Sequence, residues 1–587
     1  MVVLGVLAVG LPARGDDPAL RERARAALRK AVEFYRTKVS TQGGYHFQYT
    51  EDLSYGRSEM SDGPTRVEVQ RDGTPLVGMA YLDAYEATQD RYYLEAAREV
   101  ARALVRGQYC SGGWDYFIEF DPQKRAQFPY RFDGACPPSP DGFGAPGSEG
   151  APARPERQTT LDDNITQAAV RLLMRVDRDL NFKDAQIHEA AHFALDSLIK
   201  AQYPNGAWPQ RYSRFPDPSA FPIKPASYPE AWSRTWPGSD YRAHYTFNDD
   251  SIVDMIDAML EAARIYGEAR YLASAEKGGA FILLAQMPEP QPGWAQQYDR
   301  DMHPAWARRF EPPSITGGES LSVMKGLLLL FRETGKRKYL EPLPRALAYY
   351  RQSILPDVQS PSEIRRRACP ERTPCLARFA ELKTNRPLYI TKGTRVTALA
   401  QGTTNVDGYE LSYSDASVIT HYSVLVSGTW LAGVEQEYRE IQSADPVSLK
   451  RPDRLHGLSP WSDRPLDLST RSGSSRAQSR DDGARDKRSP TVNLETRVRA
   501  VIDAMDPRGA WVEEGTIGKP NRLVSVFAAK DMVVTLAGKT LPMKENDTLE
   551  VFAGGEPPKQ RIIRTRTFAE NVGALNAYLA SDAPPPR

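Results

Sequence analysis

The feature of this sequence that most limits its fold is a pair of amphipathic helices that recurs along the chain. At residues 76–108, apolar residues at helical spacing are followed by a short polar break and a second helical run. The pattern returns at residues 163–202, 250–286 and 319–353. Such hairpins cannot bury their apolar faces alone, so they stack on one another. We therefore expect a mainly α fold, an incomplete α/α toroid of repeated helical hairpins with a small β-containing cap.

The chain divides by composition into four parts. Residues 1–16 are an apolar run ending in small residues, typical of a signal peptide and too short to span a bilayer. Residues 17–435 contain the hairpins, followed by strand-like stretches between 379 and 425 that predict the cap, and form the expected catalytic body. Residues 436–490 are polar and charged, which predicts a mobile surface insertion. Residues 491–587 return to helical spacing and are expected to complete the toroid.

Charge and cysteine content restrict the class of protein. Lys and Arg number 76 against 75 for Asp and Glu, a balance that argues against nucleic-acid binding. No later segment is apolar enough to cross a membrane. The signal-peptide-like N-terminus leads us to expect a secreted or periplasmic protein, and we also expect a monomer. The four cysteines fit either two disulfides or four buried thiols.

An aromatic, glycine-containing loop follows the second helix of each early hairpin. The loops read GGWDY (112–116), NGAWPQRY (205–212) and PGWAQQYD (292–299). In most copies we expect Gly to make the exit turn and Trp to close the end of the hairpin. Hairpin ends line one face of a toroid, where exposed rings can serve as platforms for sugars. Trp208 and Trp294 are the candidates for that substrate-binding role.

Two neighbouring hairpins begin with clustered acidic and amide side chains. The clusters are Asp162-Asp163-Asn164 and, one repeat later, Asn248-Asp249-Asp250. One such residue is explained by ordinary helix capping, but a cap does not need three. Equivalent positions of neighbouring hairpins lie on the same face, so the clusters should converge. They suit either calcium, which takes about six to eight oxygen ligands, or an acid/base pair for glycoside hydrolysis.

The order of the motifs resembles that of one family, the family-10 pectate lyases, also called pectic acid lyases. The motifs are TLDDNIT (160–166), NGAWPQRY (205–212), HYTFNDDSIVDMI (244–256), GWAQQYD (293–299), WARRFEPPSITGGES (306–320) and LARFAELKTNRPLY (376–389). The resemblance covers about residues 70–435 and implies a calcium-dependent lyase that cleaves polygalacturonate or pectate by β-elimination.

The resemblance also implies roles for single residues. The calcium carboxylates fall on Asp162, Asp163 and Asp249, and the arginine that abstracts the proton falls on Arg378. Removing the C5 proton of a uronate builds negative charge on the neighbouring carboxylate, which calcium and cationic side chains stabilise. Because a guanidinium normally keeps its proton, Arg378 needs a transiently neutral form to act as the base. Otherwise it suits a carboxylate clamp.

Three further arginines are expected to bind substrate. Arg308 is the position that matches the family, Arg309 stands directly beside it, and Arg386 follows in the TNRP run. The sequence departs from the family pattern at Ala380-Glu381 and again from Tyr389 onward. Two other functions therefore stay open. One is an inverting glycoside hydrolase that uses the Asp pair, and the other is an inactive polyuronate-binding protein.

Overall fold

The computed structural model describes most of the hairpin region and parts of the last third of the chain. The described residues are 17–134, 136, 158–238, 241, 244–356, 368–369, 373–392, 399–400, 409–415, 418–419, 422–445, 449, 494–518, 522–527, 533–536, 539–542, 548–553 and 558–580. The predicted signal peptide and almost all of the predicted insertion beyond residue 445 lie outside these ranges.

Four helical hairpins form the body, at the positions that the sequence predicts. They are α2 (Thr74–Thr88) with α3 (Arg91–Gly107), α5 (Ile165–Asp179) with α6 (Ala185–Ala201), α7 (Ser251–Tyr266) with α8 (Ala269–Ala285), and α9 (Gly318–Thr334) with α10 (Leu343–Gln352). The second helices α3 and α6 begin at true N-caps, because the carboxylates of Asp90 and Asp184 accept backbone N–H groups of the first turn.

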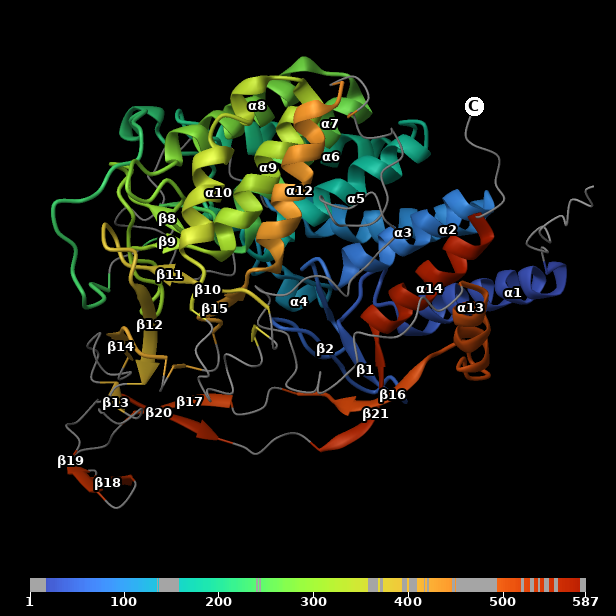
Figure 1. Ribbon diagram of the computed structural model, residues 1–587. Coiled ribbons are helices and arrows are strands. Elements are labelled where there is room, and N and C mark those ends of the chain that lie inside the picture. Colours follow the sequence, from blue (N-terminus) through green and yellow to red (C-terminus); the bar gives the residue numbers. More distant parts are fainter. Residues whose placement is uncertain are drawn as a thin grey trace, which may run out of the picture.

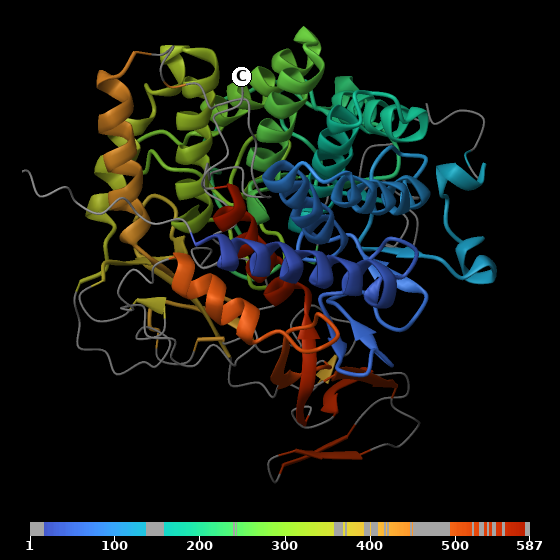
Figure 2. The same ribbon diagram turned by 90° about the vertical axis from the view of Figure 1, so that its right-hand side faces the viewer.

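The hairpins are arranged as an arc. Helices α14 (Thr565–Ala580), α2, α5, α7 and α9 pack in that order as an inner row, with α3, α6 and α8 behind them. One end of the arc carries α1 (Pro18–Phe34) and α13 (Leu494–Asp503), and the other carries α10 and α12 (Thr429–Ser443). In Figure 1, α1 and α13 lie to the right of α10 and α12, and Figure 2 shows α1 crossing in front of α14. The predicted incomplete α/α toroid is confirmed.

A short antiparallel clasp joins the two ends of the early hairpins. In each case a strand before the inner helix pairs with a strand after the outer helix. The clasps are β3 (Arg66–Glu68) with β4 (Phe117–Glu119), β5 (Thr159–Thr160) with β6 (Arg211–Tyr212), and β7 (Tyr245–Thr246) with β8 (Gln297–Tyr298). The fourth hairpin differs, because β9 (Ile315–Thr316) pairs with β11 (Phe379–Ala380) of the cap. Each clasp therefore lies at the N-terminal end of its inner helix.

Buried tryptophans close the outer helices. The indole N–H of Trp114, Trp208 and Trp511 donates to the backbone oxygen ten residues earlier, at 2.8, 2.9 and 2.8 Å, and Trp294 reaches Ile282 O at 2.9 Å. These carbonyls lie in the last helical turn, where no intrahelical donor is available. The glycine before Trp208 is required sterically, since a Cβ at Gly206 would lie 1.9 Å from Lys277 O. The plug that the sequence predicts for most copies is therefore present.

Small sheets form the predicted cap beside α9 and α12. One sheet has the order β14 (Tyr409–Ser412), β12 (Pro387–Lys392), β11, β9, and another pairs β10 (Cys375–Ala377) with β15 (Leu425–Ser427). A second apolar cluster that includes Phe310, Phe379 and Leu388 fills the cap. Because β9 opens α9 and β11 continues β10, the cap is anchored directly to the fourth hairpin.

The C-terminal part contains strands as well as the predicted helices. β16 (Val512–Thr516) and β21 (Lys559–Arg564) extend the sheet of β1 (Gln48–Thr50) and β2 (Gly56–Arg57). Four further strands lie between β16 and β21 in the sequence: β17 (Arg522–Phe527), β18 (Val533–Leu536), β19 (Lys539–Pro542) and β20 (Thr548–Ala553). β18 pairs with β19, and β20 pairs with both β17 and β13 (Leu399–Ala400). The predicted boundary at 435/436 falls inside α12, which packs on α9.

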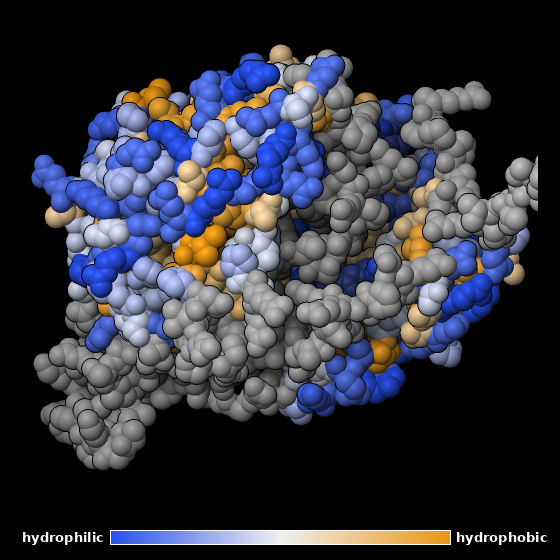
Figure 3. Space-filling view, in the orientation of Figure 1, coloured by the Kyte–Doolittle hydropathy of each residue, from blue (hydrophilic) through white to orange (hydrophobic). Residues whose placement is uncertain are grey.

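Two disulfides answer the question that the cysteine count leaves open. Cys110 pairs with Cys136 beyond α3, and Cys369 pairs with Cys375 at the start of β10. Hydrophilic residues cover most of the described surface on the face drawn in Figure 3. Within the described ranges, every helix is too short or too polar to span a lipid bilayer.

Candidate functional site

Two turns of the same shape lead into the neighbouring inner helices α5 and α7. In the first, Asp163 and Asn164 have φ values of +51° and +59°, and in the second, Asp249 and Asp250 have +51° and +58°. Such left-handed residues are uncommon outside glycine, although Asp and Asn are enriched among them. Paired backbone strain of this kind is found at functional sites and in ligand clamps. The two neighbouring repeats therefore enter their inner helices through the same turn conformation.

The turns bring the three predicted metal carboxylates together. Asp162, Asp163 and Asp249 each offer one oxygen, and these oxygens lie within 4.8 Å of one another. All three residues are half-buried. Burial, and then the charge of Asp162, raise the pKa of Asp163 to about 8. Burial and the charges of Asp163 and Asp162 likewise raise the pKa of Asp249 well above its usual range. Like charges are thus held together at a cost that a bound cation relieves.

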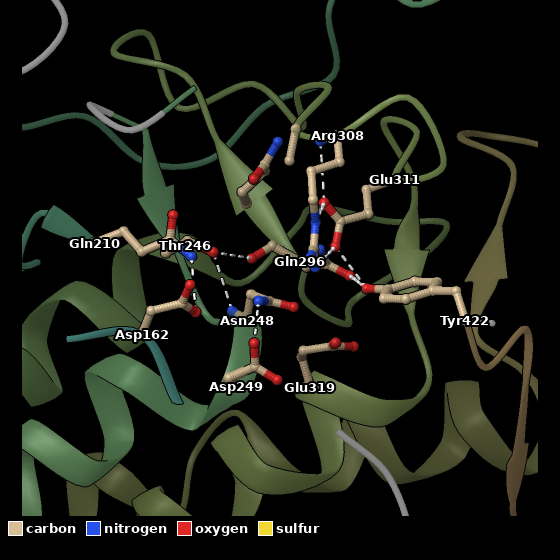
Figure 4. Close-up of polar contacts among 12 residues, drawn as sticks. Asp162, Gln210, Thr246, Asn248, Asp249, Gln296, Arg308, Glu311, Glu319 and Tyr422 are labelled. Carbon is tan, nitrogen blue, oxygen red and sulfur yellow. Dashed lines mark hydrogen bonds and ion pairs between the residues drawn. The ribbon is translucent and has the colours of Figure 1, made fainter. Parts of the chain in front are cut away.

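Neutral and cationic donors from the neighbouring clasps contact the carboxylates. Arg211 donates to Asp162 Oδ2 at 2.9 Å, and Gln210 donates to Asp162 Oδ1 at 3.1 Å. The hydroxyl of Tyr116 lies 2.9 Å from Asp163 Oδ2 and 3.3 Å from Asp162 Oδ2. Figure 4 shows Asp162, Gln210 and Asp249 around the same space.

Buried amides connect the two acidic turns. The side-chain amide of Gln167, on α5, donates to Leu161 O at 2.9 Å and to Ser251 O at 3.2 Å. Leu161 precedes the first pair of acids and Ser251 follows the second, so one amide spans both turns. Asn164 adds a second connection by donating to the carboxylate of Asp254 on α7. The spacing between the turns is therefore fixed by hydrogen bonds as well as by helix packing.

The predicted base lies on the cap side of the site. Arg378 stands immediately before β11, and its buried guanidinium pairs with Glu319, in the first turn of α9. It also contacts Gln296 Oε1 at 3.4 Å and lies 4.2 Å from the centre of the Tyr422 ring. Burial alone would lower the pKa of Arg378, but the surrounding negative charges, with Glu319 the strongest, together raise that pKa above its usual value. The described state of Arg378 is thus a paired cation.

Of the two adjacent arginines, Arg308 is the one in this cluster. It makes a two-point contact with Glu311, at 2.8 Å from Nε and 2.5 Å from Nη2. Tyr422 donates to the same carboxylate at 2.6 Å (Figure 4). Burial opposes ionisation of Glu311, but the charge of Arg308 holds its pKa down at about 2. Arg309 is half-buried on the same loop.

The last predicted substrate arginine, Arg386, is exposed at the turn between β11 and β12. Its guanidinium lies 3.5 Å from the centre of the Tyr413 ring. The hydroxyl of Tyr413 donates to Glu381 at 2.5 Å, and Arg234 pairs with the same carboxylate at 2.5 Å. Arg386 therefore belongs to a separate aromatic and ionic cluster, away from the contacts of Arg378.

The two predicted sugar platforms are wrong. Trp208 and Trp294 are 1% and 0% exposed, and both indoles are used to close outer helices. A ring without accessible faces cannot stack on a sugar. Both residues therefore have the same packing role as Trp114, which the sequence analysis expected for most copies of the loop.

Several residues of the site were not singled out from the sequence. They are Tyr116, Gln210, Arg211, Gln296, Glu311, Glu319 and Tyr422. Repeat alignment offers a signal for four of them, because Gln210, Arg211 and Gln296 lie in or beside clasp strands and Glu319 opens an inner helix. Tyr422 lies outside the quoted motifs, so only the folded cap brings it to the site.

The fold and the site define an α/α toroid with a cluster of three carboxylates near two paired arginines, Arg378 and Arg308. Residues 140–410 match the family model described as "Pectic acid lyase". The predicted family resemblance is confirmed by this match.

Solved structures of similar arrangement include a family 10 polysaccharide lyase from Cellvibrio cellulosa, as a mutant in complex with trigalacturonic acid. It is 18% identical, with a TM-score of 0.39, over 62% of this chain and 98% of that chain. A second structure of a family 10 polysaccharide lyase from Cellvibrio cellulosa is 18% identical, with a TM-score of 0.37, over 62% of this chain and 97% of that chain. A D-mannose isomerase is 14% identical, with a TM-score of 0.33, over 58% of this chain and 73% of that chain. Because these TM-scores are below 0.5, they place no residue of the site. No curated protein matches the chain.

Proposed function

We propose that this protein is a calcium-dependent pectate lyase that cleaves polygalacturonate by β-elimination. The observation that carries the proposal is the convergence of Asp162, Asp163 and Asp249 beside the buried Arg378 and the half-buried Arg308. The family match over residues 140–410 supports a polysaccharide lyase. The two disulfides suit an exported protein, so we also propose a secreted or periplasmic location.

The residues of the cluster fit a hard cation. Three carboxylates supply oxygen ligands of the kind that calcium prefers. The amide oxygens of Asn164 and Asn248 are buried beside them and accept no hydrogen bond from any described residue. Burial first, and then the neighbouring carboxylates, raise the pKa values of Asp163 and Asp249, and a bound cation would favour their charged forms. We therefore propose that Asp162, Asp163 and Asp249 hold calcium.

Calcium at this site would act as a Lewis acid toward the uronate carboxylate and stabilise the charge that develops there. The chain supplies the remaining positive charge through Arg378 and Arg308. As the base, Arg378 must first lose its proton, which the pairing with Glu319 opposes. We propose that Arg378 acts as the base once it has lost its proton. We also propose that Arg386, and either Arg308 or its neighbour Arg309, contact uronate carboxylates.

The spacing of the carboxylates disfavours the hydrolase alternative. Inverting glycosidases hold their two carboxyl groups about 6.5–9.5 Å apart to admit a water molecule. The oxygens of Asp162, Asp163 and Asp249 lie within 4.8 Å of one another, too close for that arrangement. The geometry suits a shared cation better than an acid and a base on opposite sides of a glycosidic bond.

Incubation with polygalacturonate tests the proposal. A lyase forms a C4–C5 double bond conjugated to the carboxylate, which absorbs in the ultraviolet. The expected result is ultraviolet-absorbing product that disappears with a chelator and returns with added calcium. Reducing ends without this absorbance would show a hydrolase instead. Binding without either product would show an inactive polyuronate-binding protein.

A further inference from the structure

Arg211 occupies a position in which two functions conflict. It follows Gln210 in β6, and its Nη2 atom lies 2.9 Å from Asp162 Oδ2. The same atom lies 3.3 Å from the hydroxyl of Tyr116, and the guanidinium carbon is 5.5 Å from the centre of that ring. Arg211 thus forms an ion pair with one of the three clustered carboxylates, that of Asp162.

This contact suits the metal-free cluster, and a calcium ion at Asp162 would place a second cation on the same carboxylate. Without a metal, the guanidinium offsets part of the repulsion between neighbouring carboxylates. With calcium on the same carboxylate, two positive charges would share its single negative charge, so each would be held less tightly. The paired state of Asp162 and Arg211 is therefore suited to the protein before it is loaded, and calcium weakens the hold of Asp162 on Arg211.

The arginine can reach another partner. The side chains of Arg211 and Asp162 are 20% and 13% exposed, so the pair lies at the solvent-facing edge of the cluster. A guanidinium presents paired donors that match a carboxylate. Substrate bound to calcium would bring a uronate carboxylate to this edge.

We propose that Arg211 is a substrate-binding residue that exchanges partners, from Asp162 in the free protein to a uronate carboxylate in the calcium-loaded complex. The inference rests on the proposed function, because it needs calcium at Asp162 and an anionic sugar. It adds to that function a competition between Arg211 and calcium, and a role for Arg211 in recognising the substrate.

The exchange predicts two effects of opposite sign in Arg211→Gln. In calorimetric titration with calcium alone, the Kd should fall about two- to fivefold, the size of a partly exposed ion pair that no longer competes. At saturating calcium, the KM for polygalacturonate should rise about tenfold or more, since a charge-assisted contact to the substrate is lost. A residue that only supports the fold would weaken both kinds of binding.

Arg66→Gln is the matched control. Arg66 also lies in a clasp and pairs with an acid, Glu119, at 2.9 Å, but away from the clustered carboxylates. Its loss should affect the melting temperature without changing calcium affinity or KM. Arg211→Lys covers the case in which the Gln variant does not fold. It keeps the charge but loses the forked geometry, so KM should rise while the calcium Kd stays near that of the wild type.

Two results would overturn the exchange. One is an unchanged or weaker calcium affinity in Arg211→Gln, and the other is an unchanged KM in a wild type and variant that both form the unsaturated product. A wild type that forms no such product refutes the lyase proposal instead. The metal titration without substrate would then still decide whether Arg211 competes with calcium.

Discussion

Arg378 and Glu319 form an ion pair in the interior of the candidate site, with side chains that are 7% and 6% exposed. The second oxygen of Glu319 accepts the hydroxyl of Thr316, so the carboxylate is fixed on both sides. Arg378 stands immediately before β11, the strand that pairs with β9, and Glu319 lies in the helix that β9 opens. The pairing of β9 with β11 thus places the proposed base beside a carboxylate that favours its charged form.

The first prediction separates a base from a clamp at Arg378. Lysine keeps the positive charge but not the forked guanidinium. A general base acts in the transition state, so Arg378→Lys should lower kcat by about 10²–10⁴-fold with little change in KM. Arg308→Lys, which alters a proposed substrate contact, should mainly raise KM. Steady-state kinetics on polygalacturonate measures both, and a kcat within about threefold of wild type would rule out Arg378 as the base.

The second prediction concerns the pH dependence of kcat. The Glu319 carboxylate raises the pKa of Arg378. Glu319→Gln removes that charge, so the pKa of Arg378 falls and the neutral guanidine forms at lower pH. If Arg378 is the base, the rising limb of the kcat–pH profile should move to lower pH. The variant should also melt at a lower temperature, because breaking a buried pair costs about 3–5 kcal/mol.

Thr316→Val is the control for this shift. It removes the hydroxyl that donates to Glu319 but keeps the carboxylate charge beside Arg378. Its kcat–pH profile should therefore keep the wild-type midpoint. A profile that moves equally in both variants would show that geometry, and not the charge of Glu319, sets the protonation of Arg378.

The repeat pattern predicted most of the fold because it is local. Helical spacing located all four hairpins, and the equivalence of neighbouring repeats predicted that Asp163 and Asp249 would converge. The left-handed turns that bring them together carry the Asp and Asn residues expected at such positions. The same repeat argument predicts a buried, hairpin-closing role for Trp208 and Trp294, because their loops match that of Trp114.

The arginine half of the site depends on long-range pairing and was less predictable. Tyr422 contacts Arg378 and Glu311 only because β9 and β11 join the fourth hairpin to the cap. The partner of Arg378 was also not evident, because Glu381 is near in sequence whereas Glu319 is near in space. Glu381 instead pairs with Arg234. Local sequence patterns do not predict that β9 pairs with β11 of the cap.

The third prediction concerns stability without calcium. The pKa of Asp163 is raised to about 8, so the folded protein holds this proton more tightly than the unfolded chain. The resulting stability is complete at low pH and is lost as pH rises toward and through about 8. Asp163→Asn has no carboxyl group at this position, so its stability does not fall with pH for this reason. In chelator, the variant should therefore melt above the wild type by a margin that grows with pH.

Calcium should reverse that order. A ligand at one hundred times its Kd stabilises a protein by about 2.7 kcal/mol, and the wild type should gain this while Asp163→Asn gains much less. Thermal melts of both proteins, with chelator and with calcium, measure the reversal. If the wild type melts at the same temperature in both conditions, Asp163 does not belong to a calcium site.

The last prediction tests whether Gln167 sets the spacing of the acidic turns. Its amide donates to Leu161 O and Ser251 O, on either side of the clustered carboxylates. Gln202 offers a matched control, because its amide also donates to two backbone oxygens, Gly206 O and Ser274 O, between neighbouring repeats. Both side chains are buried, at 0% and 7% exposed.

Methionine at either position keeps the approximate volume but leaves two carbonyls without their donor, at a cost of about 1–3 kcal/mol. Gln167→Met and Gln202→Met should therefore both lower the melting temperature in chelator. Only Gln167→Met should also weaken calcium binding and shrink the calcium-induced rise in melting temperature, because only its carbonyls belong to the turns that hold Asp162, Asp163 and Asp249. Equal calcium affinity in the two variants would mean that helix packing alone spaces the turns.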